Sequence, residues 1–283
     1  MRIAILLSMV LLFGLAATYS LRLPGVQPPP PTIAPGVMLD QLPVGRLATP
    51  TAGALLSWLA PLWDHPPVDA SIDHATGTVR PGQPGWRLDA AKTMAAILAA
   101  GPDQKVAPVL ETVAPRWPAE SLRNLSTPLA SFQTTITGEA NRVHNMELAA
   151  SLLNNTLVLP GQVFSFNAVA GPYDAARGYL SAPVIVDNRY ESGLAGGVCQ
   201  LSSTLYQTVL NLGLAVVERH PHTLPVPYIQ PGHDATVAGS LDFRFRNTLA
   251  TPLVIKASRQ GDSLVVTILG RRTGAGSVSP AAS

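Results

Sequence analysis

The 283-residue sequence contains a single cysteine, Cys199, which excludes an intrachain disulfide. Charged residues make up only 13% of the chain and the formal net charge is +2. This balance argues against a basic surface for nucleic acid, and the sequence has no polybasic arm or acidic tail. Hydrophobic residues make up 47%, so a chain of this length can bury one large core or two moderate ones.

The N-terminus has the pattern of an export signal. Arg2 is followed by an apolar run from Ile3 to Tyr19 that contains no charged residue. We predict a secretory signal peptide or an uncleaved N-terminal membrane anchor over residues 1–21. In either case the rest of the chain would be extracytoplasmic. It would be either secreted or held at the cytoplasmic membrane by this segment.

Two further segments are predicted to lack a packed core. Residues 22–36 include four consecutive prolines, which favour polyproline II and are typical of a semi-rigid linker. Residues 271–283 are mostly small and are expected to form a disordered tail.

Residues 37–130 have the composition of a small mixed module. Apolar spacing predicts a helix over 51–59, and Asp89 is a suitable cap for an Ala-rich helix that ends at Gly101. Alternation predicts a strand over 106–113. No catalytic cluster occurs here, so we expect an α+β module for binding or spacing.

Residues 131–270 predict a second α+β domain. Helical spacing recurs over 142–153, and strict alternation over 241–247 should direct aromatic side chains to a core and charged ones to solvent. Two apolar runs within 252–269 flank a turn and predict a hairpin. The helix after Cys199 is expected to pack on a largely antiparallel sheet.

The stretch around Cys199 carries the strongest functional signal. Gly196 and Gly197 stand just before the cysteine, separated from it only by Val198, and a helical pattern follows it, so the thiol would feel the positive end of the helix dipole. One hypothesis is a cysteine hydrolase or acyl transferase, with Cys199 as nucleophile, His222 as base and Asp234 orienting the imidazole. The residues expected to contact its substrate are Gly196, Gly197, Gln200, His220 and His233.

Two other interpretations of the same residues stay open. Cys199 could be a small buried hydrophobic residue at a tight helix start, which would make the chain a binding or scaffold protein. Cys199 with His220 or His222 and His233 has ligand types that suit zinc, but the spacing fits no closed zinc pattern. We therefore predict no metal and no cofactor, and leave open whether the chain is an enzyme.

Short motifs of the first module resemble a known domain. They are Pro66-Pro67-Val68-Asp69-Ala70, Gly82-Gln83-Pro84-Gly85-Trp86-Arg87-Leu88-Asp89 and Ala114-Pro115-Arg116. They are similar to a peptidoglycan-binding domain that is often found upstream of cell-wall domains. The resemblance implies peptidoglycan as a partner.

The second domain resembles the VanW family, which is named for an accessory protein of vancomycin-resistance clusters. The similarity runs through Arg142-Val143-His144-Asn145, Leu159-Pro160-Gly161, Gly196-Gly197-Val198-Cys199-Gln200 and Asp234-Ala235-Thr236-Val237. The chain departs from the family pattern at Tyr173, Ala195 and His233. The resemblance implies a cell-envelope protein that engages peptidoglycan or its precursors, without a defined biochemical activity.

Overall fold

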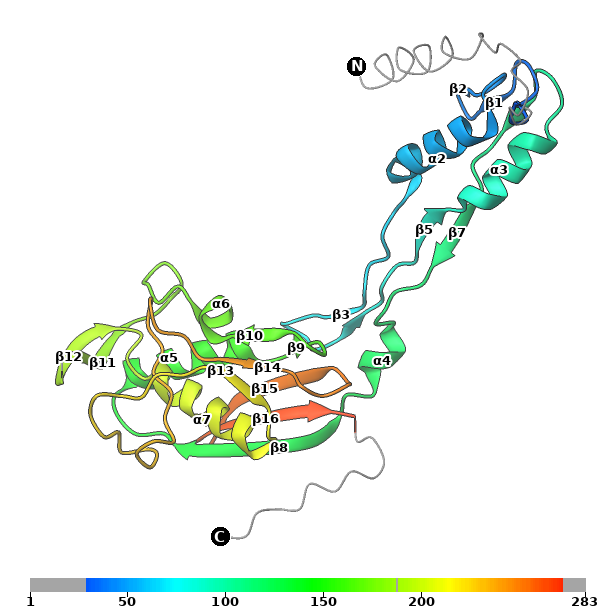
Figure 1. Cartoon of the computed structure of the whole chain (residues 1–283). Coiled ribbons are helices and arrows are strands. Elements are labelled where there is room, and N and C mark those ends of the chain that lie inside the picture. Colours follow the sequence, from blue (N-terminus) through cyan, green and yellow to red (C-terminus); the bar gives the residue numbers. More distant parts are fainter. Residues whose placement is uncertain (1–28, 187, 272–283) are drawn as a thin grey trace. The chain divides into compact units, whose positions relative to one another are not determined.

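A computed structural model describes residues 29–186 and 188–271, and these residues divide into two compact units (Figure 1). The first unit runs to Asp69 and includes Gly82–Arg116, and the second combines Ala70–Pro81 with the chain from Trp117 onward. The predicted export segment and nearly all of the predicted tail lie outside the described residues. No helix within the described ranges is long and apolar enough to cross a membrane.

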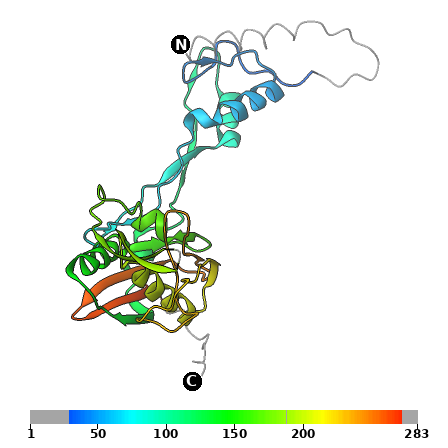
Figure 2. The same cartoon turned by 90° about the vertical axis from the view of Figure 1, so that its left-hand side faces the viewer.

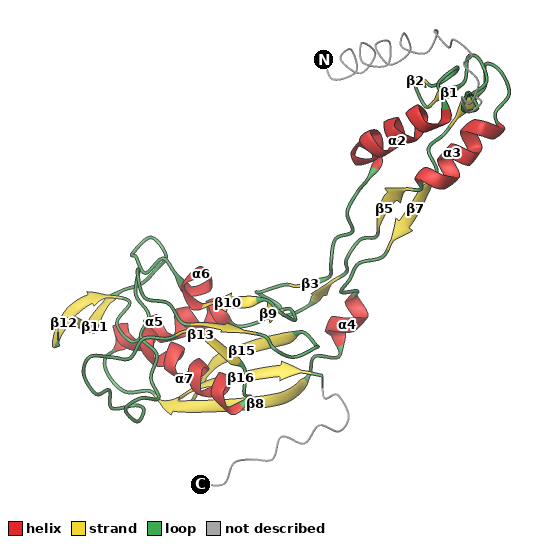
Figure 3. Cartoon of the chain, viewed as in Figure 1, coloured by secondary structure: helices red, strands yellow, loops and turns green. Residues whose placement is uncertain are grey.

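The first unit packs two helices with short strands (Figure 3). Its elements are β1 (Met38–Leu39), β2 (Leu42–Pro43), α2 (Thr49–Trp63), β5 (Gly85–Leu88), α3 (Ala90–Ala99), β6 (Lys105–Val106) and β7 (Leu110–Val113). The predicted cap of α3 is confirmed, because the Asp89 carboxylate accepts the backbone N–H of Lys92 at 2.8 Å. The single strand predicted over 106–113 is wrong. Pro108 cannot donate to a ladder, and the run divides into β6, which pairs with β1, and β7, which pairs with β5.

The second unit is built on a four-stranded antiparallel sheet with the order β8-β16-β15-β9. These strands are β8 (Thr127–Thr135), β9 (Thr156–Val158), β15 (Leu253–Gln260) and β16 (Ser263–Gly270). The predicted hairpin is β15–β16 and is confirmed. Helices α5 (Ala140–Leu153) and α7 (Val198–Asn211) pack on one face, as Figure 2 shows from the side.

Strand alternation separates the two faces of this sheet. Leu253, Ile255 and Ala257 of β15 face the helices, while Val254 faces the other side. That other side is covered by α4 (Ala119–Arg123), β3 (Ser71–Ile72) and β4 (Val79–Arg80). The expected α+β architecture is confirmed, with a helix on a largely antiparallel sheet.

A smaller sheet packs against the same core. It has the order β10-β14-β13, and a separate hairpin follows helix α6 in the chain. These elements are β10 (Val163–Ser165), α6 (Phe166–Ala170), β11 (Ser181–Val186), β12 (Arg189–Leu194), β13 (Ala215–Glu218) and β14 (Arg244–Arg246). Phe243 and Phe245 are fully buried, as the alternation predicted.

Asp242 does not belong to a solvated strand face, which corrects the prediction for the charged residues of 241–247. Its carboxylate accepts the Ser165 hydroxyl at 2.6 Å and the Asn167 backbone N–H at 2.9 Å. The carboxylate therefore secures the start of α6, where an unpaired helical N–H needs an acceptor.

Candidate functional site

Cys199 lies in the first turn of α7, and the two glycines before this helix are required by the backbone. Gly197 caps the helix with φ 104°, in the left-handed region. A Cβ added to Gly197 would lie 2.8 Å from Cγ of Arg142, and one added to Gly196 would lie 2.5 Å from the carbonyl oxygen of Pro183. The glycine pair thus lets α7 begin directly against α5 and β11.

The Cys199 thiol is a neutral group in the resting site. Sγ lies 3.4 Å from the carbonyl oxygen of Val237 and 3.5 Å from its backbone nitrogen, so it can donate to one and accept from the other. Burial raises the pKa of the thiol, and this outweighs the opposing effects of the Val237 N–H, Arg142 and the cysteine's own N–H. The predicted influence of the helix dipole is therefore not the dominant one.

His222 and Asp234 form a buried pair. Nδ1 of His222 lies 2.5 Å from Oδ2 of Asp234, and both side chains are 7% exposed. The Asp234 carboxylate also accepts the His222 backbone N–H at 2.6 Å and Nη2 of Arg219 at 2.9 Å. Burial acts to raise the pKa of Asp234, but the hydrogen bonds from His222 outweigh it and hold that pKa below its ordinary value.

A polar stripe along α7 holds the loop that carries Asp234. The Ser203 hydroxyl accepts the Ala235 N–H at 2.9 Å, and the Gln207 amide donates to the His233 carbonyl at 2.8 Å. Together with the contacts of Cys199 to Val237, these bonds recur at the spacing of one helix face. The helix therefore positions both its own thiol and the carboxylate that binds His222.

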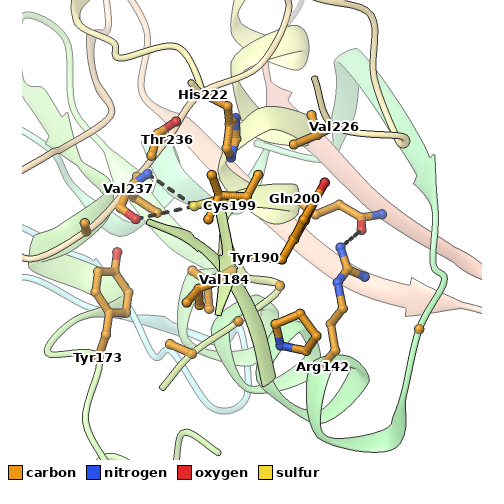
Figure 4. A pocket seen from close by; sticks show the side chains of 18 of the residues that line it. Arg142, Tyr173, Val184, Tyr190, Cys199, Gln200, His222, Val226, Thr236 and Val237 are labelled. Carbon is orange, nitrogen blue, oxygen red and sulfur yellow. Dashed lines mark hydrogen bonds between the residues drawn. The ribbon is translucent and has the colours of Figure 1, made fainter. Parts of the chain in front are cut away.

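Cys199 and His222 line one pocket of about 510 Å³ (Figure 4). Three of the residues predicted to contact substrate, Gly196, Gly197 and Gln200, line it as well. Asp234 is not among the lining residues, but its carboxylate binds Nδ1 of His222, which is. The volume is in the range of small-molecule and peptide-segment sites.

The structure does not bring His220 and His233 to this pocket. Nε2 of His220 lies 3.0 Å from a carboxylate oxygen of Glu218, and Nδ1 of His233 lies 3.0 Å from the side-chain oxygen of Gln207. Neither residue is among those that line the cavity. Across the described ranges, no group of three or more His, Cys, Asp or Glu side chains is arranged to hold a metal ion.

Several pocket residues were not expected from the sequence as site residues, among them Arg142, Tyr173 and Tyr228. The Tyr173 hydroxyl donates to Oδ1 of Asn167 at 2.6 Å. Burial raises the pKa of both Tyr173 and Tyr228, so each phenol stays protonated at neutral pH. Arg142 begins the motif noted above, but only the fold shows that its side chain reaches the pocket.

The part of the pocket wall formed by the β11–β12 hairpin is largely apolar. Its contributors include Pro183, Val184, Ile185, Tyr190 and Leu194. Tyr190 is 63% exposed although it borders the cavity, so this wall stays open to solvent on its outer side. An extended peptide could lie along such a surface with a few polar groups fixing its register.

Two family descriptions match the chain. Residues 141–269 match "VanW like protein", and residues 46–108 match "Putative peptidoglycan binding domain". The first range contains Arg142, Cys199, His222 and Asp234. No solved structure matches the chain.

Two proteins are similar to parts of the chain. "Uncharacterized protein YoaR" of Bacillus subtilis (strain 168) is 38% identical over 210 residues, which cover 71% of this chain and 68% of that protein. "Vancomycin B-type resistance protein VanW" of Enterococcus faecalis (strain ATCC 700802 / V583) is 31% identical over 115 residues, which cover 38% of this chain and 42% of that protein. The family match over residues 141–269 and the similarity to these two proteins together show that the chain belongs to the VanW family.

Proposed function

We propose that the chain is a cell-envelope protein that binds peptidoglycan and uses Cys199 for acyl transfer or hydrolysis on peptidoglycan stem peptides. The observation that carries the proposal is that Cys199 and His222 share one pocket while Asp234 binds the other ring nitrogen of His222. A nucleophile, a base and a group that orients the base are the three parts that cysteine acyl chemistry requires.

In the first step His222 would act as general base through Nε2. Nδ1 is bound to Asp234, and Nε2 has no hydrogen-bond partner among the described residues. Nε2 would take the thiol proton as Sγ attacks the carbonyl carbon of an amide, and a tetrahedral intermediate would form. The C–N bond would then break, the departing amine would receive the proton from His222, and a thioester on Cys199 would remain.

In the second step a nucleophile would cleave the thioester. His222 would remove a proton from water or from the amino group of a second peptide, and that nucleophile would displace Sγ. The thiolate would recover its proton from His222. Water would give hydrolysis and an amine would give a new amide, so the identity of the acceptor separates a hydrolase from a transferase.

The first turn of α7 offers a donor for the developing oxyanion. The backbone N–H groups of Val198 and Gln200 are bound to the carbonyls of Ala195 and Gly197 at 3.1 and 3.0 Å. The Cys199 N–H has no backbone acceptor among the described residues and lies at the positive end of the helix.

The raised pKa of Cys199 fits general-base catalysis better than a preformed thiolate. The thiol stays protonated until a substrate is bound, and His222 removes the proton as the S–C bond forms. A neutral resting thiol is also less reactive toward oxidants, because the thiolate is the reactive form. This would suit a protein that acts outside the cytoplasm.

The envelope setting is supported by the chain's relatives and by its first unit. The family description for residues 46–108 names peptidoglycan binding, and one relative is named for vancomycin resistance. The predicted export segment over residues 1–21 would place both units outside the cytoplasmic membrane. A separate binding unit would keep the site close to an insoluble polymer by raising its effective concentration.

The test compares the full-length wild type in detergent with Cys199→Ala and Cys199→Ser on soluble peptidoglycan fragments. Mass spectrometry would follow products and an acyl adduct on Cys199. Glu218→Gln is the matched control, because it alters a similar histidine–carboxylate pair outside the pocket.

Products and an adduct from the wild type and Glu218→Gln, with neither from Cys199→Ala despite retained binding, would support the enzyme. Equal product from Cys199→Ala would refute it. Binding by all variants with no product from any of them would identify a non-catalytic peptidoglycan binder. In that case the Cys199 thiol, bound to Val237, would serve only to pack α7.

A further inference from the structure

Arg142 stands out in the pocket as a cation without a negatively charged partner. Its Nη1 donates to the carbonyl oxygen of Thr137 at 2.6 Å, and its Nη2 donates to Oε1 of Gln200 at 2.7 Å (Figure 4). Nη1 also lies 3.7 Å from the sulfur of Met146, and all three acceptors are neutral. Within the described chain the Nε–H and the second Nη2–H have no acceptor, and both belong to the planar edge that binds carboxylates in parallel.

The surroundings of Arg142 do not supply a counter-charge. No ion pair joins Arg142 to an acidic side chain within residues 29–186 and 188–271. The groups that act on it electrostatically are Tyr228, whose ring centre is 5.9 Å from Cζ, and Cys199. Both are neutral at pH 7 because burial raises the pKa of the phenol and of the thiol.

Arg219 shows how this fold treats an arginine with a structural task. Its guanidinium is 20% exposed and binds the Asp234 carboxylate, so its charge is neutralised inside the protein. Arg142 is half-buried, and burial lowers its pKa, yet it has no equivalent partner. A partly desolvated cation of this kind gains most when an anionic ligand enters.

Gln200 holds this arginine ready for a ligand. Its Nε2 donates to Oγ1 of Thr134 at 3.0 Å and to the carbonyl oxygen of Thr135 at 2.8 Å. These bonds direct Oε1 toward Arg142, and Gln200 is fully buried. The side chain of Arg142 therefore loses little further freedom when it binds a ligand.

We propose that Arg142 binds a carboxylate of the peptide whose amide bond is presented to Cys199. This inference rests on the proposed function for its choice of peptide ligand, and it assigns Arg142 and Gln200 as a specificity site beside the nucleophile. The free guanidinium edge offers two parallel N–H groups, which match the two oxygens of a carboxylate. The carboxylate can come from the C-terminus of the peptide or from an internal acidic residue, and the test separates these sources.

Binding is measured on the full-length chain carrying Cys199→Ala, so that no turnover is needed. The probe is a synthetic stem-type tetrapeptide in four forms: both carboxylates free, only the terminal one amidated, only the internal one amidated, and both amidated. With Arg142 intact, we expect the fully amidated form to bind about ten- to a hundredfold more weakly than the free acid. The singly amidated form that shows this loss identifies the carboxylate.

Adding Arg142→Met should remove the preference, so that acid and amide forms bind equally. Gln200→Glu should also remove it, because the new carboxylate would pair with Arg142. Arg142→Lys should keep part of the preference, and Arg259→Met, which alters an arginine paired with Glu147 outside the pocket, should keep all of it. Circular dichroism and the thermal midpoint confirm that each variant is folded.

Equal binding of all four forms when Arg142 is intact would overturn the inference, as would no binding of any form. A preference that survives Arg142→Met would overturn it too. These outcomes are separate from those of the catalytic test. A preference that depends on Arg142 in a protein without turnover would support the carboxylate site while refuting the enzyme.

Discussion

Oδ2 of Asp234 accepts two hydrogen bonds from the same residue, one from the ring Nδ1 of His222 at 2.5 Å and one from its backbone N–H at 2.6 Å. The carboxylate therefore fixes the main chain and the ring of the histidine together. Because Nδ1 is the bound nitrogen, Nε2 is the ring nitrogen left to accept a proton. Arg219 holds the other oxygen of the carboxylate, so the pair has a further support that does not depend on substrate.

Asp234→Asn is expected to lower turnover by about a hundred- to ten-thousandfold, the range of general acid–base contributions. The amide nitrogen of Asn can donate to Nδ1, which would favour the tautomer with hydrogen on Nε2 and remove the base. The measurement is kcat/KM on peptidoglycan fragments. Glu218→Gln serves as the control and should change it little, whereas an Asp234→Asn enzyme with wild-type turnover would rule out the assigned role.

The same carboxylate predicts a dependence of stability on acid. Hydrogen bonds from His222 hold the folded-state pKa of Asp234 below its ordinary value even though burial opposes this. Its stabilising contribution should therefore be full above the unfolded pKa of about 3.9 and disappear as the pH falls through the lower folded value.

Urea unfolding followed by NMR signals of α7 would test this for wild type and Asp234→Asn. Their difference in free energy of unfolding should be constant from neutral pH down to about pH 5 and shrink below about pH 4. A difference that grew on acidification would mean that the folded-state pKa of Asp234 is raised.

The thiol should titrate above its ordinary range. Burial raises the pKa of Cys199 from an ordinary value of 9.0, so little thiolate is present at neutral pH. The rate of alkylation by iodoacetamide, measured against pH, should have its midpoint at a higher pH in the folded chain than in the unfolded chain. The sole cysteine makes the signal specific, and the same protein in urea provides the unperturbed reference. A folded midpoint below that reference would indicate a preformed thiolate.

The glycine before α7 should be far less tolerant of substitution than the glycine after it. Gly197→Ala combines a φ of 104° with a Cβ only 2.8 Å from Cγ of Arg142, whereas Gly213→Ala, at φ 70°, meets nothing within 4 Å. Both pay the left-handed penalty of about 1–2 kcal/mol. Gly197→Ala should lose about 1–3 kcal/mol more, because the new methyl group forces the arginine or the helix to move.

Denaturant unfolding of the two variants measures this difference. Gly197→Ala should also weaken binding of carboxylate peptides, since Arg142 is the group that must shift, while Gly213→Ala should leave that binding unchanged. Equal losses of stability would show that the close contact at Gly197 is relieved without cost.

Local patterns in the sequence identified much of the fold. The sequence predicts Asp89 as a helix cap and the β15–β16 hairpin from two apolar runs around a turn, because both features depend on neighbouring residues alone. The strand expected over 106–113 is interrupted at Pro108, because proline has no N–H to donate to a sheet ladder, and the run divides between two sheets. The pairing of Asp242 is not visible in the sequence, because the groups that donate hydrogen bonds to its carboxylate, the Ser165 hydroxyl and the Asn167 N–H, lie far away in the chain.

The sequence alone determined the candidate residues for the proposed chemistry: one cysteine at a helix start after two glycines, with His222 and Asp234 following. Only the tertiary structure decided which of these residues meet, because Asp234 reaches His222 through a loop that hydrogen-bonds to α7, while His220 and His233 turn to Glu218 and Gln207. Arg142 reaches the pocket from α5, and the protonated state of the thiol comes from burial. Desolvation and contacts between distant segments are properties of the packed chain, so no pattern of neighbouring residues could reveal them.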